Sequence, residues 1–217
     1  MALFLKEIGL TADRPLKTDE LAVENMSRVV CALLVDGLKR KVATTFWKLS
    51  IRINSSDLSD NGKILLGVLI VNRNFPTAEF LQSRLKDRQS LMLGFVSGVL
   101  RDVLLDANLD ASPVEDAVKY VLDKKLCNVI VGKKRFIDPT TSEVAHIKCE
   151  QEMDEARIYV VFIEKGRQAR EVLVATSVPE EFIFQSFFGR VEWDEESHPS
   201  LLKVDGSTIA VIKEHGR

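Results

Sequence analysis

The amino-acid sequence predicts an α+β fold: a mostly antiparallel sheet, a long central helix and a second helix packed against that helix. Apolar residues follow a helical period over residues 16–40 and again over 76–125. Strand-like segments occur in groups and do not alternate singly with helices, which favours α+β over regular βαβ winding. The composition is 46% apolar, 29% charged and 7% aromatic, which is ordinary for a globular protein.

Residues 16–40 are predicted to form the first helix. Apolar side chains recur at spacings of three to five between Leu21 and Leu34. Thr18 or Asp19 is a suitable N-cap, because a side-chain oxygen there accepts a backbone N–H of the first turn.

Two strands are expected next. Residues 42–53 alternate apolar and polar side chains, which is typical of a strand with one wet face. Residues 64–71 are apolar at almost every position, which predicts a strand buried on both faces. Asn61-Gly62 lies between them and is a strong turn signal, so we expect the two strands to pair as antiparallel neighbours.

The stretch 76–109 is predicted to be the long central helix. Its centre, residues 91–100, is apolar around most of the circumference. Gly94 and Gly98 lie four residues apart and are interpreted as a site of close helix packing.

A second helix is predicted to begin at Ser112 and to end near Lys125. Ser112 is interpreted as the N-cap, Pro113 as the first helical residue, and Glu115 completes a capping box.

The second half of the chain is rich in strand signals. The four expected strands are 129–137, 143–150, 157–165 and 169–176. Turns are expected at 138–142, 165–167 and Asp205-Gly206. A short helix, 180–188, and a final hairpin, 201–204 with 208–212, follow.

We expect a single domain, 1–217, with a subdivision near 110–127 as the alternative. The net charge is −2, so the protein's overall field does not attract a polyanion. An odd, sparse cysteine count, Cys31, Cys127 and Cys149, fits a reducing compartment. Neither a signal peptide nor a membrane-spanning stretch is evident, so a cytoplasmic location is predicted.

Several motif-like patterns lack the residues that their chemistry needs. Asp106, Asn108 and Asp110 are spaced as in a calcium loop, but Ala117 stands where the bidentate carboxylate is required. Ser83-x-x-Lys86 has the spacing of a Ser–Lys dyad without its companion motifs. We therefore predict no catalytic residue, no metal site and no cofactor.

One basic cluster gives an alternative site for nucleic acid. Lys133, Lys134 and Arg135 precede Phe136, and such a group could grip phosphates and stack a base. The same cluster is also explained as an exposed strand edge kept soluble by charge. Because the overall balance is slightly acidic, we do not expect a nucleic-acid partner.

The leading functional hypothesis is a non-enzymatic protein-binding protein, an inhibitor, immunity-type or adaptor protein. Its basis is an aromatic helix at 182–188 followed by an acidic loop. Aromatic anchors dominate interface energetics, and the acidic residues could face a basic partner. The same aromatic helix is also explained as a buried core helix. The predicted partner-binding residues are Glu192, Trp193, Asp194, Glu195 and Glu196.

The alternative is a hydrolase, in particular a nuclease, that uses carboxylates around residues 138–150. Asp138 and Glu143 are its candidates, although the expected lysine two residues after Glu143 is absent. Within the same strand, His146 and Cys149 are predicted to point to opposite faces, with Cys149 on the apolar one.

Overall fold

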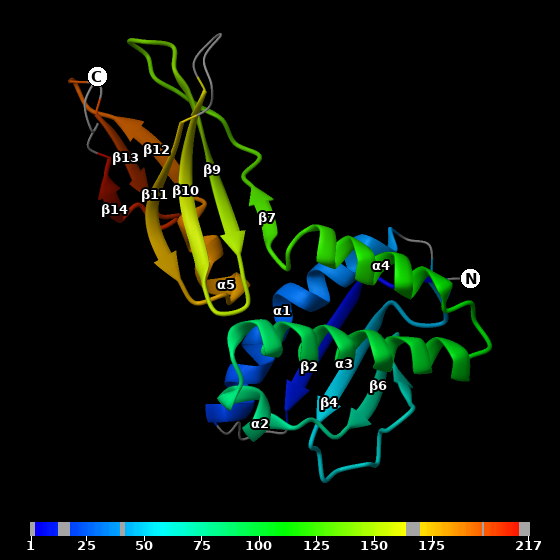
Figure 1. The fold of residues 1–217 in the computed structure, drawn as a ribbon. Coiled ribbons are helices and arrows are strands. Elements are labelled where there is room, and N and C mark those ends of the chain that lie inside the picture. Colours follow the sequence, from blue (N-terminus) through cyan, green and yellow to red (C-terminus); the bar gives the residue numbers. More distant parts are fainter. Residues whose placement is uncertain (1–2, 13–17, 40–41, 164–169, 197, 213–217) are drawn as a thin grey trace. The chain divides into compact units, whose positions relative to one another are not determined.

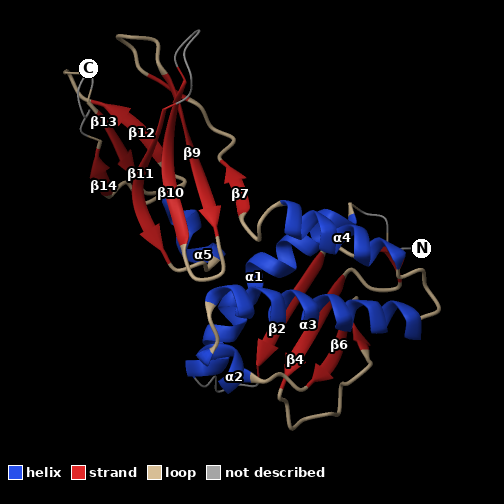
Figure 2. Ribbon diagram, viewed as in Figure 1, coloured by secondary structure: helices blue, strands red, loops and turns tan. Residues whose placement is uncertain are grey.

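The computed structural model describes residues 3–12, 18–39, 42–163, 170–196 and 198–212. Eight of the ten strand pairings in these ranges are antiparallel, and helix and strand are about equally abundant (Figures 1 and 2), which confirms the α+β prediction. Contacts group the chain into two compact units, Met1–Cys127 and Asn128–Arg217. The boundary falls directly after the stretch 110–127. The expectation of a single domain stays a prediction.

The N-terminal unit contains a four-stranded sheet with the order β2-β4-β6-β5. Its strands are β2 (Glu7–Ala12), β4 (Lys48–Ile53), β6 (Val68–Arg73) and β5 (Ile64–Leu65). A separate pair joins β1 (Leu3–Phe4) to β3 (Ala43–Thr44). In β4 the buried residues are Leu49, Ile51 and Ile53, which confirms the predicted alternation.

The prediction that 42–53 and 64–71 pair antiparallel is wrong, because β4 and β6 are parallel. The chain reverses a second time at Leu66 and Gly67, whose φ angles are +52° and +80°. This turn pairs β5 antiparallel with β6 and leaves Leu66 98% exposed, so the segment is not one strand buried on both faces. A Cβ at Gly67 would lie 2.5 Å from Cδ1 of Trp47, and the Trp47 indole donates a hydrogen bond to the Leu66 carbonyl at 3.2 Å. The turn could not be predicted from the sequence, because leucine rarely adopts the positive φ that Leu66 has here.

The helices of this unit are α1 (Thr18–Leu38), α2 (Thr77–Gln82), α3 (Leu85–Asp106) and α4 (Ser112–Asp123). The first helix, α1, connects β2 to β4, which pair in parallel. The predicted helix 76–109 is two helices, because Ser83 and Arg84 are extended with ψ of 159° and 155°. The second predicted helix does pack as expected, because α4 contacts both α3 and α1.

Close helix packing occurs at a glycine other than the two predicted. A Cβ at Gly37 would lie 2.8 Å from Cα of Ala117, so α1 and α4 meet there backbone to backbone. A Cβ at Gly94 or Gly98 would meet nothing within 4 Å, so the interpretation of this pair as a packing site is wrong.

The start of α4 differs from the predicted capping box. Ser112 is the first helical residue, and its hydroxyl donates to Oδ2 of Asp110 at 2.8 Å. Oδ1 of Asp110 also accepts the backbone N–H of Ser112 at 2.9 Å. The two residues of the expected box do not cap the helix: Asp110 holds this terminus, and Glu115 pairs with Arg101 at 3.0 Å.

The C-terminal unit contains two antiparallel sheets. The larger comprises β7 (Asn128–Val131), β8 (Phe136–Ile137), β9 (Val144–Gln151), β10 (Ala156–Ile163) and β11 (Arg170–Ser177), with β7 and β8 both paired to β9. The smaller comprises β12 (Arg190–Trp193), β13 (Pro199–Leu202) and β14 (Thr208–Val211). The turn at Asp205-Gly206 is confirmed, with φ of +87° at Gly206, whereas the turn predicted at 165–167 lies outside the described residues.

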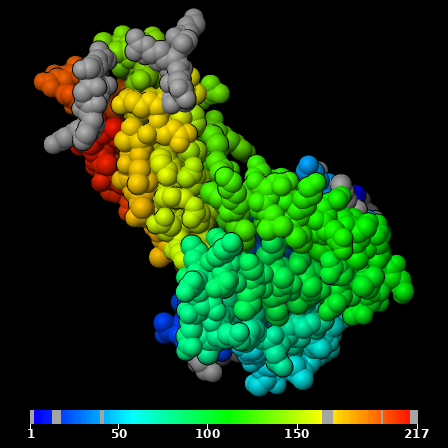
Figure 3. All heavy atoms as spheres, in the orientation of Figure 1, coloured from blue at the N-terminus to red at the C-terminus, as the bar shows by residue number. Residues whose placement is uncertain are grey.

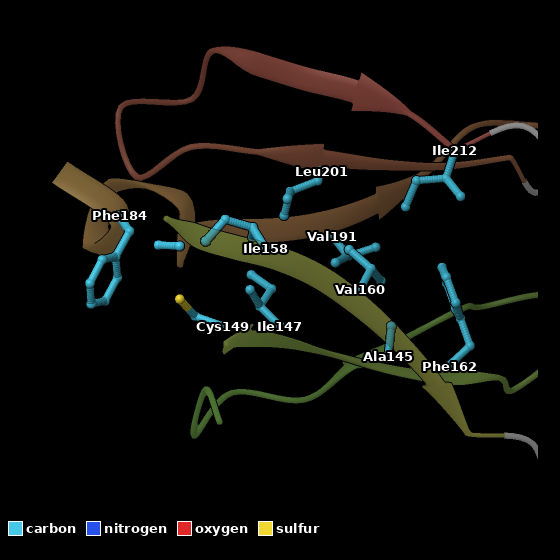
Figure 4. Packing of buried hydrophobic residues seen from close by; sticks show 11 residues of the cluster. Ala145, Ile147, Cys149, Ile158, Val160, Phe162, Phe184, Val191, Leu201 and Ile212 are labelled. Carbon is cyan, nitrogen blue, oxygen red and sulfur yellow. The ribbon is translucent and has the colours of Figure 1, made fainter. Parts of the chain in front are cut away.

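The core of this unit is enclosed by the two sheets and α5 (Glu181–Phe184), as Figure 4 shows. Strand β9 contributes Ala145, Ile147 and Cys149, all buried, which confirms the predicted apolar face. A 3-10 turn, η1 (Gln185–Phe187), continues α5.

Candidate functional site

The basic cluster predicted as the nucleic-acid alternative lies in a break of the edge strand. Strand β7 ends at Val131 and β8 begins at Phe136, and both pair with β9. The N–H of Gly132 still donates to the carbonyl of Ile147 at 2.8 Å, after which residues 133–135 leave the sheet. A break of this kind exposes part of the inner, apolar face of the sheet at its edge.

A pocket of about 260 Å³ occupies this break. Its apolar lining comes from Phe136, Ile147 and Phe188, and Lys133 and Lys134 complete the wall. A Cβ at position 132 would be a tight fit, 3.1 Å from the Ile147 carbonyl oxygen and 3.2 Å from Cδ1 of Phe188.

The rim of this pocket is electropositive. Lys133, Lys134 and Arg135 are all exposed. Of these three, Lys133 and Lys134 line the pocket. Burial lowers the pKa of His146 on β9, and the positive charge of Arg135 lowers it further. The structure thus brings the predicted cluster together with Phe136, and it adds Phe188 and Ile147, which sequence reasoning did not connect with the cluster.

The predicted acidic loop is a strand end followed by a turn. Glu192 and Trp193 belong to β12, which the sequence analysis missed, and the remaining three acids follow it. Trp193 is half-buried and packs against the core. Glu192 pairs with Arg190 at 2.5 Å.

Asp194 organises the turn. Its Oδ1 accepts the backbone N–H groups of Glu196 at 2.9 Å and His198 at 2.8 Å. The backbone hydrogen bond from His198 is the largest of the causes that lower the pKa of Asp194. The Nδ1 atom of His198 lies 3.3 Å from Oδ2 of Asp194 and 3.6 Å from Oε2 of Glu196. Glu195 and Glu196 are exposed at the tip.

The aromatic segment 182–188 is partly buried and partly exposed. Phe184 is completely buried, whereas Phe182 is 85% exposed. Phe188 lines the pocket and Phe187 lies under Nζ of Lys203, 5.2 Å from its ring centre. Within the C-terminal unit, α5 and the turn after β12 lie at opposite ends (Figure 1). The aromatic and acidic stretches therefore do not form one surface.

The two carboxylates of the hydrolase alternative have structural partners. Asp138 is 2% exposed, and its oxygens accept the N–H of Thr140 at 2.9 Å and the hydroxyl of Thr141 at 2.6 Å. Burial would raise the pKa of Asp138, but these hydrogen bonds outweigh burial and lower it. Glu143 lies 3.9 Å from Arg170. These contacts do not test the hydrolase alternative, which stays a prediction.

A charged network that the sequence did not reveal crosses the outer face of the larger sheet, where β10 and β11 form a continuous surface (yellow in Figure 3). Lys148 is its centre: Nζ lies 3.0 Å from Glu150, contacts Glu171 and lies 4.6 Å from the ring centre of Tyr159. Burial would lower the pKa of Lys148, but hydrogen bonds to Glu171 and Glu150 raise it. The only available signal was that Lys148 and Glu150 share a strand face.

The described ranges contain neither a candidate metal site nor a helix that could span a membrane. No group of three or more His, Cys, Asp or Glu side chains there is arranged to hold a metal ion. Among the helices of those ranges, none has the length and apolarity needed to cross a bilayer. Comparison with known proteins gave no relative: no family model, curated protein or solved structure matches this chain.

Proposed function

We propose that this chain is a non-enzymatic protein that binds a basic protein partner, as an inhibitor, immunity-type or adaptor protein does. The contact surface is the acidic segment Glu192–Glu196 at one end of the C-terminal unit. The observation that carries the proposal is the hydrogen-bonded turn at Asp194, which holds exposed carboxylates in a fixed arrangement.

Ordering before binding lowers the entropic cost of association. In this segment the Asp194 side chain accepts two backbone N–H groups, and the Asp194 N–H donates to the His198 carbonyl at 3.1 Å. Glu195 and Glu196 therefore project from a turn that is already formed. Carboxylates at the rim of an interface chiefly accelerate encounter with a positive partner.

Trp193 has a different role in this proposal. Because its ring packs against the core of the unit, it fixes the strand from which the turn projects. Trp193→Ala is expected to lower the free energy of unfolding by about 2 kcal/mol, as truncation of a partly buried aromatic does.

The test reverses charge at the tip. With a basic partner protein captured on the wild-type chain, a Glu195→Lys/Glu196→Lys variant should associate about tenfold more slowly, with a weaker salt dependence and an unchanged thermal midpoint. Glu180→Lys/Glu181→Lys, at the start of α5, is the matched control and should associate at the wild-type rate. Association of the Glu195→Lys/Glu196→Lys variant at the wild-type rate would contradict the proposal. Equal slowing of both double variants would contradict it as well.

A cytoplasmic location is part of the same proposal. No disulfide joins Cys31, Cys127 and Cys149, all three of which lie in the described ranges, and Cys31 and Cys149 are buried. Burial raises the pKa of Cys31 to about 12, which suppresses the reactive thiolate. Unbridged thiols are the usual state in a reducing compartment.

A further inference from the structure

The pocket between β7 and β8 is independent of the acidic turn and has its own chemistry. Three apolar side chains, Phe136, Ile147 and Phe188, line it, and the side chains of Lys133 and Lys134 stand beside them. An occupant that satisfies both features has an apolar body and a negative charge at the mouth.

The volume limits the size of this occupant. Pockets for drug-sized ligands measure roughly 300–1,000 Å³, and this one measures about 260 Å³. The space therefore suits a body of about one ring or a short branched chain. The backbone of Gly132 contributes to this limit, because it already lies against Ile147 and Phe188.

The lining discriminates between hydrocarbon and nucleobase. A base that enters the pocket would bury ring nitrogens and carbonyl groups, and burying polar atoms without hydrogen-bond partners costs free energy. Phe136, Ile147 and Phe188 offer no side-chain donor or acceptor. A hydrocarbon body carries no such cost, and its anionic group can remain at the solvated lysine rim.

We propose that this pocket binds a small organic carboxylate whose body is a single aromatic ring or a short hydrocarbon chain. The body inserts between Phe136 and Phe188, and the carboxylate accepts hydrogen bonds from the ammonium groups of Lys133 and Lys134. Lysine suits this role because its flexible stem carries a compact, hydrated charge that follows the ligand.

The experiment is a titration of the full-length protein with 3-phenylpropionate, followed by amide chemical shifts in ¹⁵N-labelled protein. Shifts should appear at Gly132, Phe136, Ile147 and Phe188, with millimolar affinity, as expected for a ligand of this size. Two further ligands separate the contributions: 3-phenylpropionamide lacks the charge, and acetate lacks the ring. The amide should bind about fivefold more weakly, and acetate should leave these residues unshifted.

A matched pair of variants tests the lysines. Lys133→Gln/Lys134→Gln should weaken 3-phenylpropionate about fivefold and leave the affinity for 3-phenylpropionamide unchanged. Lys86→Gln/Lys119→Gln removes the same charge from exposed positions on α3 and α4 and should bind both ligands as the wild type does.

Four outcomes would overturn the proposal. The first is no shift at the pocket residues with any ligand. The second is equal binding of the carboxylate and the amide, which would leave an apolar cavity only. The third is binding of acetate as strong as that of 3-phenylpropionate, which would leave an anion site only. The fourth is tighter, lysine-dependent binding of a short single-stranded oligonucleotide, which would make the basic cluster a nucleic-acid site. None of these outcomes depends on Glu195 or Glu196, so they leave the proposed function untouched.

Discussion

At the scale of single residues, two aspartates close turns by similar hydrogen bonds in very different surroundings. Asp138 is almost completely buried and accepts hydrogen bonds from Thr140 and Thr141. Asp205 is exposed and accepts the N–H of Ser207 at 2.9 Å and its hydroxyl at 2.7 Å. The hydrogen bonds of Asp138 are partly shielded from water and those of Asp205 are exposed, so water replaces a lost acceptor less readily at Asp138.

Asp138→Ala is therefore expected to lower the free energy of unfolding by about 1 kcal/mol, because the turn loses the buried carboxylate that accepts two part-buried hydrogen bonds. The measurement is urea denaturation at neutral pH. Asp205→Ala is the control and should move the urea midpoint much less. A larger effect at Asp205 would mean that burial does not set the importance of these turns.

The ion pairs around Lys148 give a pH dependence. Burial would raise the pKa of Glu150, but the hydrogen bond from Lys148 and the Lys148 charge lower it. The resulting stabilisation is complete above the ordinary carboxyl pKa of 4.5 and is lost as pH falls through the lower pKa of the folded state. The pKa of Lys148 is raised, so the stabilisation that Lys148 contributes is complete below its ordinary pKa of 10.5. It is lost as pH rises through the higher pKa of the folded state.

We expect urea midpoints to fall on both the acid and the alkaline side of this window. Glu150→Gln should flatten the acid limb, because the shifted carboxylate is gone. Glu181→Gln, at an exposed position on α5, should retain the wild-type profile. An acid limb unchanged in Glu150→Gln would show that other groups control it.

At the scale of elements, α1 and α4 depend on one glycine for their close approach. Gly37 faces Ala117 at a separation that excludes a Cβ, whereas Gly94 on α3 faces open space. A glycine inside a helix has an entropic cost, so it is advantageous where a neighbouring backbone must come close and disadvantageous elsewhere.

Gly37→Ala should therefore destabilise the protein by about 1–3 kcal/mol, because α1 and α4 must separate to admit the methyl group. Gly94→Ala is the matched control and should stabilise it by about 0.5–1 kcal/mol through helix propensity. Thermal unfolding of both variants provides the comparison. Destabilisation by both substitutions would contradict the assigned difference.

At the scale of the whole molecule, the C-terminal unit has a core made from its own elements. The cluster around Ile158 and Phe162 draws all its members from residues 145–212. The chain divides into two compact units directly after residue 127, and the choice between one domain and the subdivision near 110–127 stays a prediction.

We expect the fragment 128–217 to unfold cooperatively when expressed alone, since it contains its complete core. The measurement is the near-ultraviolet circular dichroism and urea transition of the fragment beside those of the full chain. A fragment without a cooperative transition would favour a single folding domain.

Much of the fold follows from local patterns in the sequence. The period of two in β4 and the apolar face of β9 predicted burial correctly, because alternation within one strand is a property of the backbone. The turn at Asp205-Gly206 was likewise predictable. The strand β12 was missed because charged residues at five of seven positions from 190 to 196 resemble a loop.

Only the tertiary structure decided the remaining features, since each depends on residues far apart in the chain. The parallel pairing of β4 with β6 depends on an extra reversal of the chain at Leu66-Gly67. In this turn the Leu66 carbonyl accepts a hydrogen bond from the indole of Trp47, the residue before β4. The basic cluster could be recognised in the sequence, but the pocket could not. Its lining includes Phe188, which lies 55 residues after Lys133 in the chain. Local periodicity fixes which side of an element is buried, and it carries no information about which distant element covers that side.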